Sequence, residues 1–248
     1  MLEFFVVFLA GLAGGALNAV AGGGTFLTFP ALVWLGVPPV MANATATLCA
    51  LPGYFGSTWA FRNDFKAEGP LGLRAIIAVA MAGGLTGSLL LLVTPGNLFT
   101  EIVPWLLALA TLLFALGPWL LAQLRRRGAT AGAMVSGLMI FLVSAYGGYF
   151  NGGLGIMLLA AFGLIGFTNL NAMCGLKNLL SSLLSLVSAV TYASAGLIAW
   201  DAALVLAIGT MVGGYLGAHY ARKITRTDLL RLGIVAIGCV MTVVFFLR

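Results

Sequence analysis

Long apolar runs follow one another along almost the whole chain and decide what it can fold into. They are separated by short stretches rich in polar residues, Gly or Pro, and lie at about 4–20, 23–36, 41–61, 71–93, 102–122, 132–150, 154–167, 172–194, 201–221 and 229–247. Most of them approach the ~20 residues that a helix needs to cross a bilayer core. Because 62% of the residues are apolar and only 7% are charged, the chain lacks the polar surface of a water-soluble domain. We therefore expect an all-α, polytopic membrane protein in direct contact with the lipid bilayer, and this composition excludes a nucleic-acid-binding module.

The basic residues predict the orientation in the membrane. Most Lys and Arg side chains lie between or at the ends of the apolar runs, notably at 62–70, 123–131 and 222–228. Positively charged loops stay on the cytoplasmic side, so we expect a multi-pass protein of the cell inner membrane with these linkers inside. The three linkers share one side only when every run makes its own crossing or return. The three Cys residues lie far apart in apolar runs, which indicates neither a disulfide framework nor a metal site.

Two runs, 23–36 and 154–167, are too short to cross the membrane comfortably. Each has about 14 residues, or roughly 21 Å as a helix. Each follows a Gly-rich break, at 22–24 and at 152–155 respectively. We expect each short run to form a broken or re-entrant pair with the run before it, because irregular backbone is tolerated in a membrane only where protein or water surrounds it. The sequence thus predicts about eight full transmembrane helices plus short broken helices.

The second half of the chain resembles the first. Asn18 followed by Gly22 recurs as Asn151 followed by Gly155, at an offset of 133. Three further landmarks recur at an offset of 130, namely Gly36 as Gly166, Ala42 as Ala172, and the run 83–87 as 213–217. We predict a first transmembrane repeat at 1–124, a basic cytoplasmic linker at 125–131 and a second repeat at 132–248. Five segments per repeat, an odd number, would invert the second copy, as in secondary transporters whose site lies near the midplane.

The spacing of Gly83 and Gly87, and of Gly213 and Gly217, is that of helices which cross closely. We expect these glycines to serve packing within the bundle, with a homodimer through them as the alternative.

Few residues could carry catalysis. The acidic residues lie at or near the ends of the runs, no two carboxylates sit at helical spacing, and His219 is the only histidine. We therefore expect neither an enzyme nor a bound metal or cofactor.

Lys177 is the exception among the charges, because it lies inside an apolar run. A lysine at the bilayer centre costs at least about 2.5–3.5 kcal/mol unless it has a partner, reaches the interface or binds an anion. Asn178, Ser181, Ser185 and Ser188 form a polar stripe at helical spacing beside it. Both a snorkelling lysine and an anion ligand fit this pattern.

The Gly-rich breaks predict an anion site. A short helix that starts near residues 23–25 or 153–155 presents free backbone N–H groups and a positive dipole end. Inverted symmetry would point the two N-termini at each other, and Lys177 would make the chamber electropositive. Such a chamber suits a small anion with oxygen acceptors. Close packing alone would also explain the glycines.

The motifs also resemble those of a known family. The stretches Asn18-Ala-Val-Ala-Gly22-Gly-Gly-Thr25 and Ala42-Asn-Ala-Thr45-Ala-Thr47, with Leu35-Gly-Val-Pro38 between them, are similar to the signature of the TauE/SafE (TSUP) family of sulfite and organosulfonate exporters. Gly147-Gly-Tyr-Phe-Asn151-Gly-Gly-Leu-Gly155 and Gly175-Leu-Lys177-Asn178 resemble that family's second copy. The resemblance covers nearly the whole chain and implies a transporter of small sulfur-containing anions.

The resemblance and the polar residues together define a predicted substrate site. Its members are Asn18, Gly22, Gly23, Gly24, Thr25, Asn43, Thr45, Thr47, Asn151, Gly152, Gly153, Gly155, Lys177, Asn178 and Ser181. We predict a secondary transporter that moves sulfite, thiosulfate or an organosulfonate such as sulfoacetate by alternating access. An anion channel, uptake in place of export, and a membrane enzyme or assembly subunit are the alternatives; the last would need a converged acid–base set.

Overall fold

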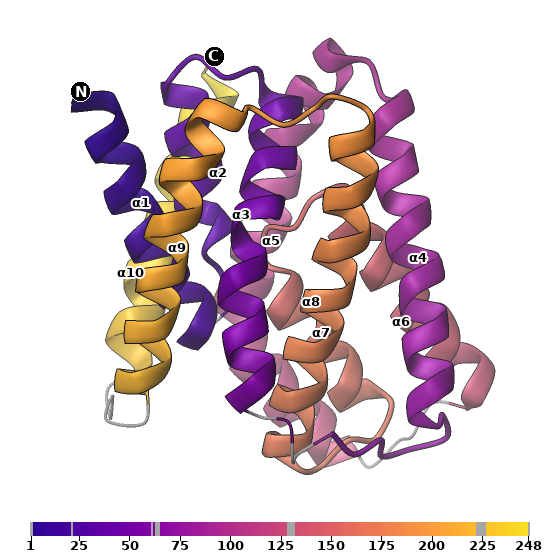
Figure 1. Cartoon of the computed structure of the whole chain (residues 1–248). Helices are drawn as coiled ribbons and strands as arrows, with labels where there is room; N and C mark the ends of the chain where they lie inside the picture. The colour runs from indigo at the N-terminus through magenta and orange to yellow at the C-terminus, as the bar shows by residue number, and fades with distance from the viewer. Residues whose placement is uncertain are drawn as a thin grey trace.

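The computed structural model describes residues 2–20, 22–60, 62, 65–127, 132–221 and 227–247, and within them it is all helical (Figure 1). This confirms the expected fold class. The helices are α1 (Leu2–Val20), α2 (Thr25–Trp34), α3 (Pro39–Ala60), α4 (Leu73–Val93), α5 (Gly96–Arg127), α6 (Ala133–Tyr149), α7 (Leu154–Leu164), α8 (Leu170–Ser194), α9 (Trp200–Ala221) and α10 (Thr227–Phe246). Every predicted run contains one helix. Arg125–Arg127 of the predicted linker end α5, whereas 128–131 lie outside the described residues, as do 222–226 of the third basic loop.

The helix lengths agree with the expected pattern of long and short segments. α2 and α7 have 10 and 11 residues, and the other described helices have 17 or more. By length and composition, four stretches of the described chain could each cross a membrane, at Leu73–Val93, Gly96–Leu113, Asn171–Ser194 and Trp200–Gly217. α5 is longer than the expected 102–122, because polar residues at both of its ends continue the helix beyond the apolar run.

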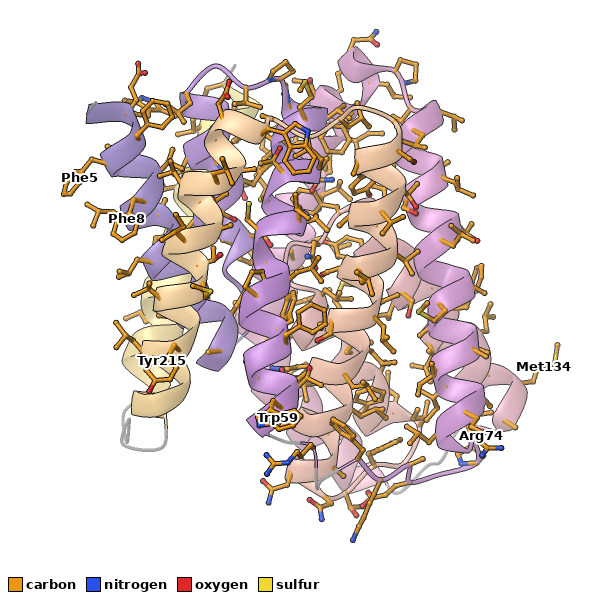
Figure 2. All side chains as sticks on the ribbon, in the orientation of Figure 1. Phe5, Phe8, Trp59, Arg74, Met134 and Tyr215 are labelled. Carbon is orange, nitrogen blue, oxygen red and sulfur yellow. The ribbon has the colours of Figure 1, made fainter. Side chains whose placement is uncertain are left out.

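Large apolar side chains cover the outside of the bundle. All five Trp side chains are more than half exposed. Figure 2 shows Phe5, Phe8 and Tyr215 pointing away from the helices. An exposed apolar surface of this extent requires a lipid environment.

Two helix pairs form the closest crossings. α1 packs along α9, and α4 packs along α6 (Figure 1). A Cβ atom at Gly83 would stand 2.5 Å from the Phe141 carbonyl oxygen, and one at Gly217 would stand 2.6 Å from Ala16 Cα. The glycine motifs therefore pack helices within one chain, as predicted, because only a residue without a side chain lets two backbones approach this closely.

The helices of the two halves correspond in order. α1 and α6 begin at 2 and 133, α2 and α7 at 25 and 154, and α5 and α10 at 96 and 227. The pairing of α1 with α9 is matched by that of α6 with α4, and α3 with α9 by α8 with α4. Phe5 near the start of α1 and Met134 near the start of α6 lie at opposite ends of the bundle (Figure 2).

One landmark of the sequence repeat was wrong. Asn18 lies in the last turn of α1, whereas Asn151 lies after the end of α6. The two Asn residues therefore do not occupy equivalent positions. The glycines with positive φ mark the breaks better, with φ +82° at Gly22 and +76° at Gly153. An Asn side chain can bond the free backbone groups of a broken helix from either side of the break. Its position in the sequence can therefore differ between the two repeats more easily than that of a glycine in the left-handed conformation.

Candidate functional site

The break between α1 and α2 is held by Asn18. Its side-chain oxygen accepts a hydrogen bond from the Gly24 backbone N–H at 2.7 Å, and the Asn18 side chain is only 3% exposed. A Cβ atom at Gly24 would stand 2.7 Å from Asn18 Cγ, so the capping contact requires glycine there. The bond occupies one of the N–H groups expected to be free at the start of α2. It leaves the NH₂ group of Asn18 as the end that can donate to a ligand.

The break between α6 and α7 is held by two side chains. The Asn151 amide donates to the Ser185 hydroxyl of α8 at 3.1 Å, and the Tyr146 hydroxyl donates to the Gly152 carbonyl at 2.8 Å. Gly153 caps α7 in the left-handed conformation. Tyr146 was not among the predicted site residues; a Tyr in an apolar run shortly before a Gly-rich break was the signal that could have identified it.

The two breaks meet. A Cβ atom at Gly155 would stand 3.3 Å from Gly22 Cα, and the same atom would stand 3.3 Å from Lys177 Cδ. The aliphatic stem of Lys177 therefore lies against the point where the breaks of the two halves cross. Gly23 and Thr25, which follow Gly22 in the chain, are also buried. Thr25 is the first residue of α2. We refer to this contact of Gly22, Gly155 and Lys177 as the break crossing.

Lys177 is buried and does not reach the surface. It is the eighth residue of α8, and its side chain is 3% exposed. In the described part of the chain, no carboxylate is close enough to compensate its ammonium. Glu3, Glu101 and Asp201 are exposed at or near helix starts. The structure thus contradicts the snorkelling alternative and leaves a buried lysine at the break crossing.

Unpaired polar atoms lie on α8 and in the α6–α7 break. Asn151 Oδ1, Asn178 Oδ1 and Ser181 Oγ are buried, and no hydrogen-bond partner is found for them among the described residues. Asn178, Ser181 and Ser185 are spaced at i, i+3 and i+7, which places them on one helical face. Buried polar atoms are almost always paired, so these atoms are candidates for contact with water or a ligand.

The predicted residues of α3 lie elsewhere. Asn43 is fully buried and donates to the Tyr149 carbonyl at 2.9 Å, and Thr45 accepts from the Ala199 N–H at 3.0 Å. Thr47 donates to the Asn43 carbonyl of its own helix at 2.9 Å. Farther along α3, the Thr58 hydroxyl contacts that of Ser182 in α8 at 2.7 Å.

The distance along α3 separates these residues from the break crossing. The 15 residues from Asn43 to Thr58 correspond to about 22 Å of helix. α3 and α8 run antiparallel, since Thr45 contacts the end that follows α8 and Thr58 contacts its middle. Thr45 thus lies toward the α8–α9 connection, whereas Asn43 lies against the last residue of α6, directly before the α6–α7 break.

A loop carboxylate fixes the start of α8. Glu68 accepts hydrogen bonds from the backbone N–H groups of Thr168 and Asn169 at 2.7 and 3.2 Å. These bonds stabilise the charged form and hold the pKa of the Glu68 carboxyl below its usual range. Asn169 in turn caps α8 by accepting from the Asn171 and Ala172 N–H groups. The helix that carries Lys177 is therefore anchored to the first half of the chain.

Comparison with known proteins decides the family. The family described as sulfite exporter TauE/SafE matches residues 7–245. The chain belongs to this family. A probable membrane transporter protein of Haemophilus influenzae is 29% identical over 239 residues, covering 96% of this chain and 92% of that protein. The probable membrane transporter protein YfcA of Escherichia coli K12 is 28% identical over 242 residues, covering 96% and 86%. This TauE/SafE protein is thus a multi-pass membrane transporter and not an enzyme.

Proposed function

We propose that this TauE/SafE protein is a secondary transporter that moves a small sulfur-containing anion, such as sulfite, thiosulfate or an organosulfonate like sulfoacetate, across the cell inner membrane. The substrate binds at the break crossing, with its charge against Lys177. The name of the family supports the sulfur chemistry. The halves 1–124 and 132–248 act as inverted repeats, supported by the matched helix order and by the opposite ends at which α1 and α6 begin.

The burial of Lys177 without a carboxylate carries this proposal. A buried ammonium is costly unless a negative charge lies close to it. Here the compensating charge is supplied by the substrate. The NH₂ group of Asn18 and the Gly155 backbone N–H add donors for the oxygens of the anion, since the Leu154 and Ile156 N–H groups are already bonded to backbone carbonyls.

The packing suggests how the site opens to each side in turn. The buried apolar residues form two clusters, one mainly from α1, α2, α3, α5 and α9, and the other mainly from α4, α6, α7 and α8. Gly22 belongs to the first group of helices, whereas Gly155 and Lys177 belong to the second. Rocking of one group against the other would change access at the break crossing without unfolding either core, which is how inverted-repeat transporters work.

Flux into proteoliposomes tests the proposal. With labelled sulfite and sulfoacetate as solutes, Lys177→Met should raise the half-saturating concentration at least about tenfold, because one charge-assisted contact of 1.4 kcal/mol or more is lost. Lys66→Met is the matched control, since Lys66 is exposed in a loop and should leave flux unchanged. Equal flux in the two variants and the parent protein would refute a role for Lys177. Single-channel currents without saturable exchange would identify a channel, and a defined gradient separates export from uptake.

A further inference from the structure

An apolar groove opens on the outside of the bundle between α1, α2 and α10. Its volume is about 270 Å³, and the residues that line it include Val6 of α1, Ala31 and Trp34 of α2, and Met241 and Phe245 of α10. Every lining residue is apolar. The groove lies toward the end of the bundle where the chain begins and ends (Figure 1). It is formed jointly by the first and the second half of the chain.

The groove is continuous with the surface that faces lipid. Trp34 and Val244, which line it, are exposed, and so are Phe5 and Leu9 on α1 next to it. Water does not fill a space of this kind, because spaces lined by apolar side chains stay dry and take up apolar molecules. The apolar molecules that surround such a surface in a membrane are the acyl chains of lipids.

Trp34 indicates how an acyl chain lies in the groove. It is the last residue of α2 and is 57% exposed, and tryptophan is enriched at the level of the lipid headgroups. Leu27, which also lines the groove, precedes Trp34 by seven residues, or about 10 Å of helix. The groove therefore runs from the headgroup level toward the hydrocarbon layer, as an acyl chain does.

The wall of the groove belongs to an aromatic row that reaches the second break. Phe245 stacks on Phe29 of α2, with ring centroids 5.5 Å apart, and Phe29 meets Phe150 edge-on at 5.7 Å. Phe150 directly precedes Asn151 in the α6–α7 break. A molecule in the groove therefore packs against α10 and against α2, the short helix that follows the first break.

We propose that this groove binds one acyl chain of a membrane phospholipid and that the bound chain braces α2 against α10. Three helices contact a chain in the groove, so it buries more apolar surface than a chain that lies along a single helix. It should therefore stay bound when detergent replaces the bulk lipid. Because the lining residues carry no charge, the lipid headgroup contributes little to this binding. The site is separate from the break crossing and does not depend on the proposed transport function.

Native mass spectrometry of the detergent-purified full-length protein tests the site. The probes are palmitoyl-oleoyl phosphatidylethanolamine and palmitoyl-oleoyl phosphatidylglycerol, which should bind equally well. Ala31→Phe places a ring in the groove and should weaken both lipids at least about tenfold, since the loss of two buried methylene groups already gives that factor. Ala78→Phe is the matched control, because Ala78 is exposed on α4 outside the groove, and it should bind both lipids like the parent protein.

The bracing of α2 has a separate readout. Adding either phospholipid back to delipidated protein should raise the Tm of the parent and of Ala78→Phe more than that of Ala31→Phe, because a ligand of the folded state stabilises it. If Ala31→Phe does not fold, Val6→Phe fills the groove from the α1 side and should give the same loss of lipid binding.

Three results would overturn the proposal. Equal lipid binding and an equal rise in Tm for Ala31→Phe and Ala78→Phe would show that the groove holds no lipid. Binding of phosphatidylglycerol alone would assign the binding to a headgroup in place of an acyl chain. A lipid-free dimer that dissociates in Ala31→Phe would identify a second copy of the chain as the occupant.

Discussion

Replacing Lys177 with Met should make the empty protein more stable while it weakens anion binding. The side chain is 3% exposed, lies against Gly155 and has no carboxylate partner among the described residues. Met has a similar length and fills the same space against Gly155 without a charge. The substitution therefore removes a desolvation cost and breaks no ion pair of the protein.

The size of this effect follows from the cost of a buried lysine. Insertion of Lys at the centre of a membrane helix costs about 2.5–3.5 kcal/mol, which sets the scale of the expected gain. At roughly 2–4 °C per kcal/mol for a chain of this size, Lys177→Met should raise the apparent Tm by about 5–14 °C. The assay is thermal unfolding of the detergent-purified protein without substrate, in a buffer free of sulfur oxyanions. Addition of a transported anion should then raise the Tm of the parent protein and leave that of the variant unchanged.

A fall in Tm would refute this reasoning. Breaking a buried ion pair destabilises a protein by about 3–5 kcal/mol, so a less stable variant would show that the ammonium has an anionic partner in the empty protein. An unchanged Tm would show that water already solvates the ammonium.

Three further predictions concern residues away from Lys177. In α6, Gly148→Ala should destabilise the protein by more than about 2 kcal/mol, because its Cβ atom would overlap the Gly84 carbonyl, whereas Gly137→Ala, with nothing within 4 Å, should be neutral or stabilising by up to about 1 kcal/mol. Thermal unfolding separates the two, and equal effects would contradict the close crossing of α4 and α6. Glu68→Gln should lower Tm slightly at neutral pH. Hydrogen bonds lower the pKa of this carboxyl in the folded protein, so its stabilising contribution is present above the ordinary value of about 4.3 and is lost as pH falls through the lower folded value. The plots of Tm against pH for the parent protein and the variant should therefore converge in acid. Thr45→Val should cost about 0.5–1.5 kcal/mol through the lost bond to the Ala199 N–H, and it should change anion affinity less than twofold; a tenfold loss of affinity would place Thr45 in the substrate site.

Much of the fold was predictable because lipid leaves few choices. Every described helix coincides with an apolar run, and the Gly-rich breaks end where α2 and α7 begin. The bilayer forces backbone hydrogen bonds to be satisfied within each segment. The length of each apolar run and the polar or Gly-rich residues that end it are therefore enough to predict the helices. The close crossings were readable from the spacing of Gly83 and Gly87, because a backbone contact tolerates no side chain. The full length of α5 could not be predicted, because the ends of this helix extend beyond the apolar run and hydropathy does not distinguish them from loops.

The candidate site was predictable in part. Gly22, Gly155 and Lys177 come together, and Asn43 bonds the Tyr149 carbonyl directly before the second break, whereas Thr45 bonds the Ala199 N–H. A sequence motif groups residues that are neighbours along one helix, whereas a binding site groups residues of different helices that lie at the same depth in the bundle. Two polar residues separated by several turns can belong to the same motif and still lie at different depths. The partners Tyr146 and Ser185 were missed as holders of the break, because their role depends on which carbonyl or amide the fold brings within reach.

Among the side chains that the structure describes, Lys177 is the one buried basic residue, and the duplicated architecture does not repeat it. α3 and α8 begin at 39 and 170, so the position that corresponds to Lys177 is Ala46, which is buried and apolar. A second lysine there would place two like charges in the same low-dielectric interior, where each would raise the cost of the other. One ammonium is enough to compensate one monovalent anion. Under the proposed mechanism, Asn18 and Gly22 would contribute a neutral donor and backbone from the other group of helices, so an anion held by Lys177 would stay with α8 while that group moves past it. Alternating access needs such an unequal hold, because a solute bound equally by both halves would resist their separation.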